Sequence, residues 1–385
     1  MKKVKNDVFY VGVNDHQLDL FEGHYIVPNG MAYNSYVILD DKVAVMDSIE
    51  AHFLDEWLRN IKEVIKDRKV DYLVVHHMEP DHSANIKNFL EVYPDATIVA
   101  SMQAFKMMSQ FFPGFEPKNK LIVKEGDILP LGKHQLRFIG APMIHWPEVM
   151  FSYLEEENIL FSADAFGKFG ALDVEEEWAC EARRYYFGIV GKFGVQVQAV
   201  LKKLAAYKID IICPLHGPIL DKDLDYYLNL YNIWSSYGVE KEGVAIFYTS
   251  VYGHTKEAVL MLQEELLKLG CEHVAVNDLA REDMAECVED AFKYGRIVLA
   301  TTTFNMQIFP YMNEFINSLV ERNYQNKTIG FIENGSWAPA AGKVMKEKLQ
   351  ELKNITYVEP MVKILSAVND KNKEEIKELA RAMLK

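Results

Sequence analysis

Four side chains that can bind metal ions fall within six consecutive residues: His77, Glu79, Asp81 and His82 of the run HMEPDH. The run begins at the last residue of the segment 71–77, which is apolar, rich in β-branched residues and typical of a strand buried on both faces. In an extended chain residues two apart project to the same side, so His77, Glu79 and Asp81 can converge. His82 stands at the start of a predicted helix and can point toward a second ion. The spacing therefore predicts a two-metal cluster.

Three further ligand-type residues stand at the ends of other predicted strands: His145, Asp164 and His216. These strands are expected at 135–142, 158–164 and 209–216. If the strands share a sheet, the three side chains gather in space. Imidazoles and carboxylates in roughly equal number suit iron, manganese or zinc and suit copper(I) poorly. A carboxylate such as Asp164 can bridge two cations about 3.5–4 Å apart.

Ordinary packing does not explain the run 77–82, because two buried imidazoles and two buried carboxylates without a cation would leave costly unpaired charge. Ordinary packing or surface exposure is the preferred explanation for the isolated histidines: His16, His52, His134 and His273. His76 points opposite His77 on the same predicted strand. We expect His76 to have a structural role or to support the ligands.

The composition is that of a globular chain with more than one domain. Its 385 residues are 49% apolar, and this length favours two or three units, with two as the first expectation. No transmembrane-length apolar stretch or signal peptide is found, so a soluble, cytoplasmic protein is expected. The net charge of −14, without a basic patch, argues against nucleic acid as a partner. Four widely spaced cysteines argue against a disulfide framework, a zinc knuckle or an iron–sulfur centre.

The two parts of the chain show different patterns. Up to about residue 240, predicted strands are mixed with a few helices, among them the amphipathic segment 53–65. From Gly243 an apolar strand and an amphipathic helix alternate five times. This alternation predicts a parallel, doubly wound sheet with ligand-binding loops at the carboxyl ends of its strands. The short polar stretch from near Tyr237 to Gly243 is the expected domain boundary.

Three loops in the second part have the composition of a binding site. The first strand runs into a turn at a helix start, made of Ser250, Val251, Tyr252, Gly253, His254 and Thr255. Hydroxyls and backbone N–H groups at a helix N-terminus form an anion site, here sized for a single phosphate. The third strand ends in Thr301, Thr302, Thr303, Phe304 and Asn305, and the fourth in Glu333, Asn334, Gly335, Ser336, Trp337 and Ala338. The chain contains no GxGxxG fingerprint and no GxxxxGK(S/T) loop, so a dinucleotide-binding domain and nucleotide hydrolysis lack support.

The order of the metal-ligand residues resembles that of a known family. HxExDH, a later His, Asp164 in the setting SADAFG and His216 in PLHGP are similar to the metallo-β-lactamase-like domain of flavodiiron proteins. Zinc hydrolases of the wider superfamily carry HxHxDH, with a second His where this chain has Glu79. A carboxylate is a harder ligand and adds negative charge, which favours iron over zinc and redox chemistry over hydrolysis. The resemblance implies that all seven residues surround two iron ions, and whether His82 is a direct ligand stays open.

The three loops of the second part resemble the phosphate loop and the two isoalloxazine-flanking loops of flavodoxins, which implies bound FMN. Phe304 and Trp337 are the expected neighbours of the flavin ring. The sequence departs from the commoner pattern in having His254 where Asn is frequent, and Pro339 with Ala340 where glycines are usual. These departures concern the detailed ring contacts and leave the assignment of FMN in place.

The resemblance covers nearly the whole chain and implies its fold, activity and partners. The implied fold is α/β: an N-terminal αββα metallo-β-lactamase-like sandwich, 1–241, followed by a flavodoxin-like doubly wound parallel five-stranded sheet, 242–385. The implied activity is reduction of O₂ to water, of NO to N₂O, or of both, at a non-haem diiron centre supplied with electrons through FMN. The implied partners are rubredoxin or a similar electron carrier and a second copy of the chain in a head-to-tail homodimer. Dimers of this kind can form homotetramers, and neither nucleic acid nor a membrane is an expected partner.

The sequence leaves several choices open. The preference between O₂ and NO depends on residues around the ligands, and His24, Tyr25 and Trp146 are candidates. The electron donor and the choice between dimer and tetramer are also undecided. One rival interpretation is a zinc hydrolase joined to a flavodoxin module, against which Glu79 argues. The other is a non-catalytic electron carrier or gas sensor, against which the seven intact ligand positions argue.

Overall fold

The computed structural model describes residues 2–385, which form two compact units. The first comprises the chain up to Tyr186 with Val195–Asn232, and the second comprises Phe187–Gly194 with Ile233–Lys385. Contacts between residues thus place the boundary between the units at Ile233, within the helix Leu224–Ser235. The boundary between residues 241 and 242, expected from the sequence, stays a prediction. No helix among the described residues is long and apolar enough to cross a membrane.

Two β-sheets enclose the core of the first unit. In spatial order, the first sheet contains β1 (Lys3–Lys5), β2 (Val8–Tyr10), β7 (Tyr36–Leu39), β8 (Val43–Met46), β9 (Tyr72–Val75), β10 (Thr97–Ala100) and β11 (Lys120–Ile122). The second contains β12 (Ile128–Pro130), β13 (Gln135–Gly140), β14 (Met150–Leu154), β15 (Ile159–Phe161) and β16 (Ile211–Cys213). Leu136 and Phe138 of β13, two residues apart, point into the same core as Ile38 and Met46 of the first sheet. The apolar side chains at alternate positions of both sheets thus pack against one another, and the two sheets lie face to face.

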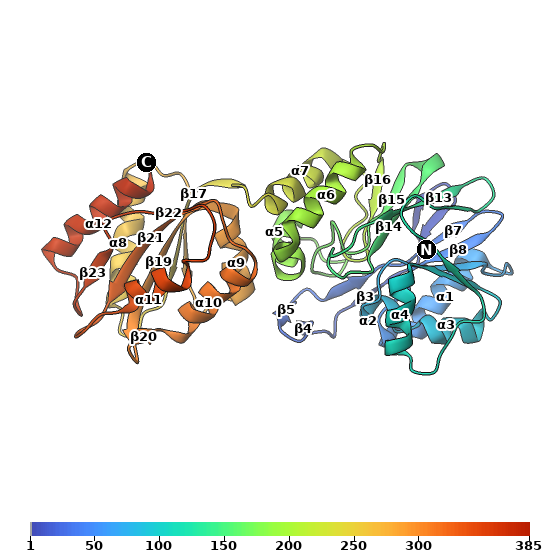
Figure 1. The fold of residues 1–385 in the computed structure, drawn as a ribbon, viewed down its shortest axis with the longest axis horizontal. Helices are drawn as coiled ribbons and strands as arrows, with labels where there is room; N and C mark the ends of the chain where they lie inside the picture. Colours follow the sequence, from blue (N-terminus) through green and yellow to red (C-terminus); the bar gives the residue numbers. More distant parts are fainter. Residues whose placement is uncertain (1) are drawn as a thin grey trace. The chain divides into compact units, whose positions relative to one another are not determined.

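Helices cover the outer sides of both sheets (Figure 1). Beside the first sheet lie α1 (Leu54–Ile65), α3 (Ile86–Val92) and α4 (Met102–Phe111), and beside the second lie α5 (Trp178–Tyr185), α6 (Gly194–Leu204) and α7 (Leu224–Ser235). Helix α1 buries Trp57, Ile61 and Ile65, whose spacing of four residues places them on one helix face. The αββα sandwich expected from the sequence is confirmed. Two short pairs complete the unit: β3 (Val13–Asp15) with β6 (Met31–Tyr33), and β4 (Leu20–Phe21) with β5 (Tyr25–Ile26).

The helix expected near Ser83 begins earlier. Helix α2 (Pro80–Ser83) starts at Pro80 and is followed by α3. Proline is favoured at the first helical position, because an N–H there has no partner within the helix. Asp81 and His82 therefore belong to a helical turn and not to an extended segment.

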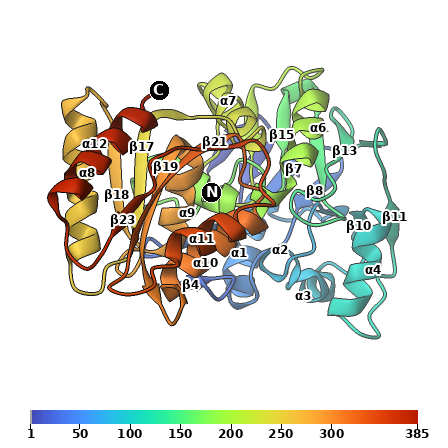
Figure 2. The ribbon, with the colours of Figure 1, turned by 60° about the vertical axis from the view of Figure 1, so that its left-hand side comes forward.

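The second unit contains a parallel sheet of the flavodoxin-like order β18-β17-β19-β21-β22. The strands are β17 (Lys241–Tyr248), β18 (Val274–Asp278), β19 (Tyr294–Phe304), β21 (Lys327–Asn334) and β22 (Ile355–Tyr357), with β20 (Gln307–Ile308) beside β19. The expected fifth strand is split, because β23 (Val362–Ile364) also pairs with β21, and Pro360 between the two pieces has no N–H to donate. Helices α8 (His254–Lys268) and α12 (Asp370–Met383) cover one face, and α9 (Met284–Lys293), α10 (Pro310–Glu321) and α11 (Ala341–Lys348) the other (Figure 2). Cys213, Cys271 and Cys287 are buried, and Cys180 is partly buried.

Lys327, the first residue of β21, carries a buried amine. Its Nζ donates to the carbonyl oxygens of Gly238 (2.8 Å) and Phe292 (2.9 Å). Burial lowers the pKa of Lys327 to about 7, although the charge of Glu240 opposes the shift. The native state therefore releases a proton that the unfolded chain keeps up to about pH 10.

Replacing Lys327 with Met is expected to change how stability depends on pH. Between pH 7 and about 10 the unfolded wild type holds more protons at this residue than the native state. Its free energy of unfolding therefore rises with pH by up to about 1.4 kcal/mol per pH unit relative to the variant. Urea unfolding at several pH values measures this difference, with Lys343→Met at an exposed lysine as the control. A difference between wild type and Lys327→Met that stays constant with pH would contradict the lowered pKa.

Candidate metal centre and ligand pocket

All seven predicted metal ligands lie in loops or turns that follow strands of the sandwich. His77 and Glu79 lie in the loop after β9, and Asp81 and His82 lie in α2. His145, Asp164 and His216 follow β13, β15 and β16 of the other sheet. Strands β15 and β16 are parallel, and β13 is antiparallel to β14, which is antiparallel to β15, so the carboxyl ends of β13, β15 and β16 share one edge. The topology thus gathers residues that are far apart in the sequence.

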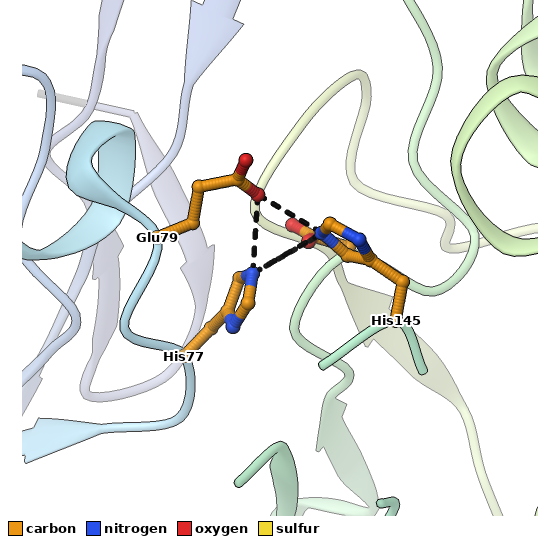
Figure 3. A group of neighbouring side chains, drawn as sticks. His77, Glu79 and His145 are labelled. Carbon is orange, nitrogen blue, oxygen red and sulfur yellow. Dashed lines mark hydrogen bonds and ion pairs between the residues drawn. The ribbon is translucent and has the colours of Figure 1, made fainter. Parts of the chain in front are cut away.

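The first group of side chains consists of His77, Glu79, His145 and Asp164, whose potential ligand atoms lie within 4.8 Å of one another. Figure 3 shows His77 and Glu79 approaching His145 from the opposite sheet. Oε2 of Glu79 lies 3.2 Å from Nε2 of His77 and 2.9 Å from Nε2 of His145. The two Nε2 atoms are 3.3 Å apart. One cation can be reached by all four side chains.

The second group consists of Asp81, His82 and His216. Nε2 of His82 lies 3.0 Å from Nε2 of His216, and Nε2 of His216 lies 3.2 Å from Oδ2 of Asp81. Asp81 was expected to converge with His77 and Glu79. It belongs with the second group instead, because α2 begins at Pro80 and turns its side chain away from the extended-strand direction.

Asp164 lies between the two groups. Its Oδ2 is 3.3 Å from Nε2 of His77 and 3.3 Å from Nε2 of His145, whereas its Oδ1 is 3.2 Å from Nε2 of His82. Each oxygen thus faces a different set of imidazoles. This is the geometry of a carboxylate that bridges two cations.

The residues fit two metal ions. Within residues 2–385, both carboxylate oxygens of Asp81 and of Asp164 are buried and have no hydrogen-bond donor. Buried acceptors of this kind are costly unless a cation or a donor satisfies them. In each group two imidazole Nε2 atoms lie close together, at 3.3 Å for His77 and His145 and at 3.0 Å for His82 and His216. A metal ion in each group could be coordinated by both of these nitrogen atoms. A set of three histidines or more with carboxylates suits iron, manganese or zinc.

In the absence of a cation, protons on the imidazoles balance the carboxylates. Burial by itself lowers the pKa of His77, but the charge of Asp164 and hydrogen bonds to Glu148 and Glu79 outweigh burial and raise it. The pKa of His145 is raised to about 9 by Asp164 and Glu79, again against burial. Burial by itself would raise the pKa of Asp164, but the nearby imidazoles outweigh burial and hold this pKa well below its usual range. Metal ions would replace these protons as the source of positive charge.

Two of the ligand imidazoles are oriented by bonds to their other nitrogen. Nδ1 of His77 lies 2.8 Å from Oε1 of Glu148, which also accepts a hydrogen bond from the backbone N–H of Met78 (2.8 Å). Nδ1 of His216 donates to the carbonyl oxygen of Ala32 (2.8 Å). Because Nδ1 is engaged in each ring, the lone pair of Nε2 faces the cluster.

Asp47 and Ser48, directly after β8, hold both ends of the ligand loop. Oδ1 of Asp47 accepts the backbone N–H of His76, and Oδ2 lies 2.5 Å from Nδ1 of the same residue. Nε2 of His76 is 2.8 Å from Oγ of Ser152. Both the backbone N–H and the hydroxyl of Ser48 donate to the carbonyl oxygen of His82. The supporting role expected of His76 agrees with these bonds.

Glu148, Asp47 and Ser48 were not identified from the sequence. Glu148 stands three residues after His145, and this proximity was the available signal. Asp47 and Ser48 act through bonds to residues about thirty positions away, for which the sequence offers no spacing rule.

The three candidates for tuning the site are placed differently. The ring of Trp146 lies 5.1 Å from the ring of His77, and the buried Tyr25 packs on Phe169 at 5.5 Å. His24 is exposed, and its ring lies 3.9 Å from the ring of Tyr25 at an angle of 39°. Glu22 of the same hairpin is exposed over the whole residue, but its carboxyl group is partly desolvated beside Glu79. This local desolvation, together with the charge of Glu79, raises the pKa of Glu22 to about 7.

A pocket of about 660 Å³ lies at the carboxyl ends of β17, β19 and β21 in the second unit. The predicted residues that line it are Ser250, Val251, Tyr252, His254, Thr255, Thr302, Thr303, Phe304, Asn305, Asn334, Gly335, Ser336 and Trp337, and Met306 and Ser366 join them. Gly253, Thr301 and Ala338 are not among the lining residues: Thr301 is buried and bonded to Thr249. The hydroxyl of Ser250 accepts from the N–H groups of Gly253 and Lys256 and so orders the turn before α8.

The pocket fits a flat aromatic ligand that carries one phosphate. Tyr252 and Trp337 at its mouth are 91% and 79% exposed, an unusual state for rings of this size unless a ligand or partner covers them. The turn 250–255 at the start of α8 offers hydroxyls and backbone N–H groups to an anion.

Sequence comparisons and structure comparisons find similar relatives for this chain. The family model described as "ODP family beta lactamase" matches residues 31–217. The nitric oxide reductase of Moorella thermoacetica is 30% identical over 368 residues, which cover 93% of this chain and 91% of that protein. Rubredoxin oxygen:oxidoreductase from Desulfovibrio gigas superposes with a TM-score of 0.92 at 26% identity, over 99% of this chain and 97% of the other. The flavodiiron protein from Giardia intestinalis superposes with a TM-score of 0.92 at 25% identity, over 100% and 96%.

Removing the Glu148 side chain is expected to weaken metal binding. Glu148→Ala deprives His77 of the partner that fixes its ring, and loss of such a partner typically costs about 10–100-fold in metal affinity. Glu148→Gln keeps an oxygen acceptor and is expected to lose less. Anaerobic competition against a coloured chelator measures the affinity for Fe²⁺, with Glu116→Ala at an exposed position as the control. Equal affinity in Glu148→Ala and wild type would show that Glu148 does not position His77.

Proposed function

The chain belongs to the flavodiiron protein family, and we propose that it reduces O₂ to water, NO to N₂O, or both, at two iron ions that receive electrons through FMN. The position of Asp164 carries the proposal, because its two oxygens face two separate groups of imidazoles. A site for one cation would not need a buried carboxylate shared in this way.

Glu79 supports iron over zinc. It stands 2.9–3.2 Å from two imidazoles of the first group, in a position where zinc hydrolases of the wider superfamily have a third imidazole. The carboxylate makes the group more negative and harder, and this favours iron and redox chemistry. The zinc-hydrolase alternative therefore lacks the ligand that it would need.

Aromatic side chains shield the ligands from water. The rings of Phe21 and Tyr185 lie 5.5 and 5.6 Å from the ring of His216, and the ring of Trp146 covers His77. When bound, the two ferrous ions supply electrons and act as Lewis acids toward the gas. The protein residues hold the ligands in place and limit access to small molecules.

The pocket between 250–255, 301–305 and 333–338 is the proposed FMN site. The turn 250–255 would hold the phosphate, and Phe304 and Trp337 would flank the ring. When bound, FMN accepts and passes on electrons.

The proposal includes a protein donor and a second subunit. A rubredoxin-like carrier, as named for the Desulfovibrio gigas relative, would deliver the electrons. A head-to-tail homodimer, with the FMN of one subunit against the diiron centre of the other, would cover the exposed Tyr252 and Trp337. Tetramers and a cytoplasmic location remain predictions from the sequence.

Rapid mixing of the reduced protein with each gas tests the proposal. Protein purified without oxygen is expected to hold two irons and one FMN per chain, and its flavin is expected to reoxidise rapidly with at least one of O₂ and NO. Glu79→His is expected to bind more zinc and to reoxidise at least about 100-fold more slowly, because a redox-inactive ion cannot pass electrons.

Iron-free protein that retains FMN is the control, because reduced flavin can react with O₂ without iron. Wild-type protein that contains two zinc ions, or that reoxidises no faster than this control, would overturn the proposal.

A further inference from the structure

The pocket at the carboxyl ends of β17, β19 and β21 has almost no charged side chains. Its walls consist of hydroxyl groups, amides, and apolar or aromatic side chains. Within residues 2–385, no aspartate, glutamate, lysine or arginine lines this pocket, and His254 is the one lining residue that can carry a positive charge. A ligand with a phosphate group therefore meets a cationic side chain in this pocket only when the imidazole of His254 is protonated.

His254 stands where the phosphate is expected. It is the first residue of α8 and directly follows Gly253, whose φ of 95° shapes the turn before the helix. The backbone N–H groups of Gly253 and Lys256 already donate to the hydroxyl of Ser250. Because these two N–H groups are engaged within the turn, the charge of a side chain matters more for holding an anion, and hydrogen bonds from a charged donor are the stronger ones.

The groups around the imidazole of His254 act on its charge in opposite directions. The positive end of the α8 dipole disfavours a charged imidazole at the first residue of the helix. Nδ1 of His254 lies 3.7 Å from Oε2 of Glu257, one turn further along α8, and the Glu257 carboxylate favours the charged form. Glu257 in turn interacts electrostatically with Lys373 of α12, and Lys256 is exposed outside the pocket. A bound phosphate would add negative charge on the pocket side and stabilise the charged imidazole.

We propose that His254 makes the binding of the flavin phosphate depend on pH and thereby selects FMN over flavins that lack a phosphate. This inference rests on the proposed function. An imidazole changes its charge between about pH 5 and 8, whereas a phosphate monoester keeps most of its second negative charge down to about pH 6. As the pH falls from about 8 to about 6.5, the imidazole gains charge and the phosphate loses little, so the ion pair strengthens. Below about pH 6 the phosphate takes up a proton, and the strengthening ends.

Titration of the flavin-free, full-length protein with FMN and with riboflavin tests the proposal. Flavin fluorescence gives the two dissociation constants at about pH 8 and about pH 6.5. Riboflavin lacks the phosphate and therefore corrects for pH effects elsewhere in the pocket. The ratio of the riboflavin constant to the FMN constant is expected to be about two- to fivefold larger at the lower pH, which is the size of effect that a partly exposed ion pair produces.

Three variants identify the residue responsible. His254→Asn introduces the residue that is frequent here in flavodoxins, and its ratio is expected not to rise as the pH falls, because only the phosphate still titrates. His254→Lys carries its charge at both pH values and is expected to show a high ratio at both. His273→Asn, at an exposed histidine of the same unit outside the pocket, is the matched control and is expected to behave as the wild type.

A wild-type ratio that is the same at both pH values, or a His254→Asn ratio that rises as in the wild type, would overturn the role of His254. If His254→Asn does not fold, His254→Lys decides alone: a ratio that still rises at the lower pH as in the wild type counts against His254. Wild-type protein that binds neither flavin overturns the FMN site itself. Failure of the proposed reductase activity is distinct, because FMN would then bind with the expected pH dependence while neither gas reoxidised the protein.

Discussion

Buried negative charge at one end of the sandwich is the constraint on which the first unit depends. Asp164 is fully buried, and its two oxygens face imidazoles on opposite sides without a hydrogen-bond donor. Such a carboxylate is strongly unfavourable unless positive charge is close. Protons on His77 and His145 can provide that charge, and two divalent cations provide it better. The fold therefore creates a need for metal at the point where the two sheets bring their loops together.

The framework that holds this charge uses both sheets. Asp47 and Ser48 of the first sheet fix the two ends of the ligand loop, and Glu148, just before β14 of the second sheet, orients His77. The carbonyl oxygen of Ala32 orients His216. Because the hydrogen bonds come from the ends of β8 and β14 and from β6, the ligands keep their positions without relying on the metal alone.

The sequence was sufficient to predict the two folds, and the structure brings the seven candidate ligands together in two groups; that they bind metal stays a prediction. Each of the residues His145, Asp164 and His216 follows an apolar strand, and strand ends that share an edge must bring such residues together. Five alternating strands and helices likewise predicted the parallel sheet and its loops. The assignment of Asp81 was not predictable in this way, because it depends on a helix that begins at Pro80 and not near Ser83. The split of the fifth strand and the supporting bonds of Asp47 depend on partners that local patterns do not specify.

The claim that Asp164 joins two irons can be tested most directly by Mössbauer spectroscopy of protein loaded with isotopically enriched iron. The wild type is expected to hold two irons per chain whose spins are coupled in the oxidised state, and Asp164→Asn is expected to lose this coupling or one of the irons. A single iron, or two irons without magnetic coupling in the wild type, would contradict the bridging role of Asp164 and with it the account of the site.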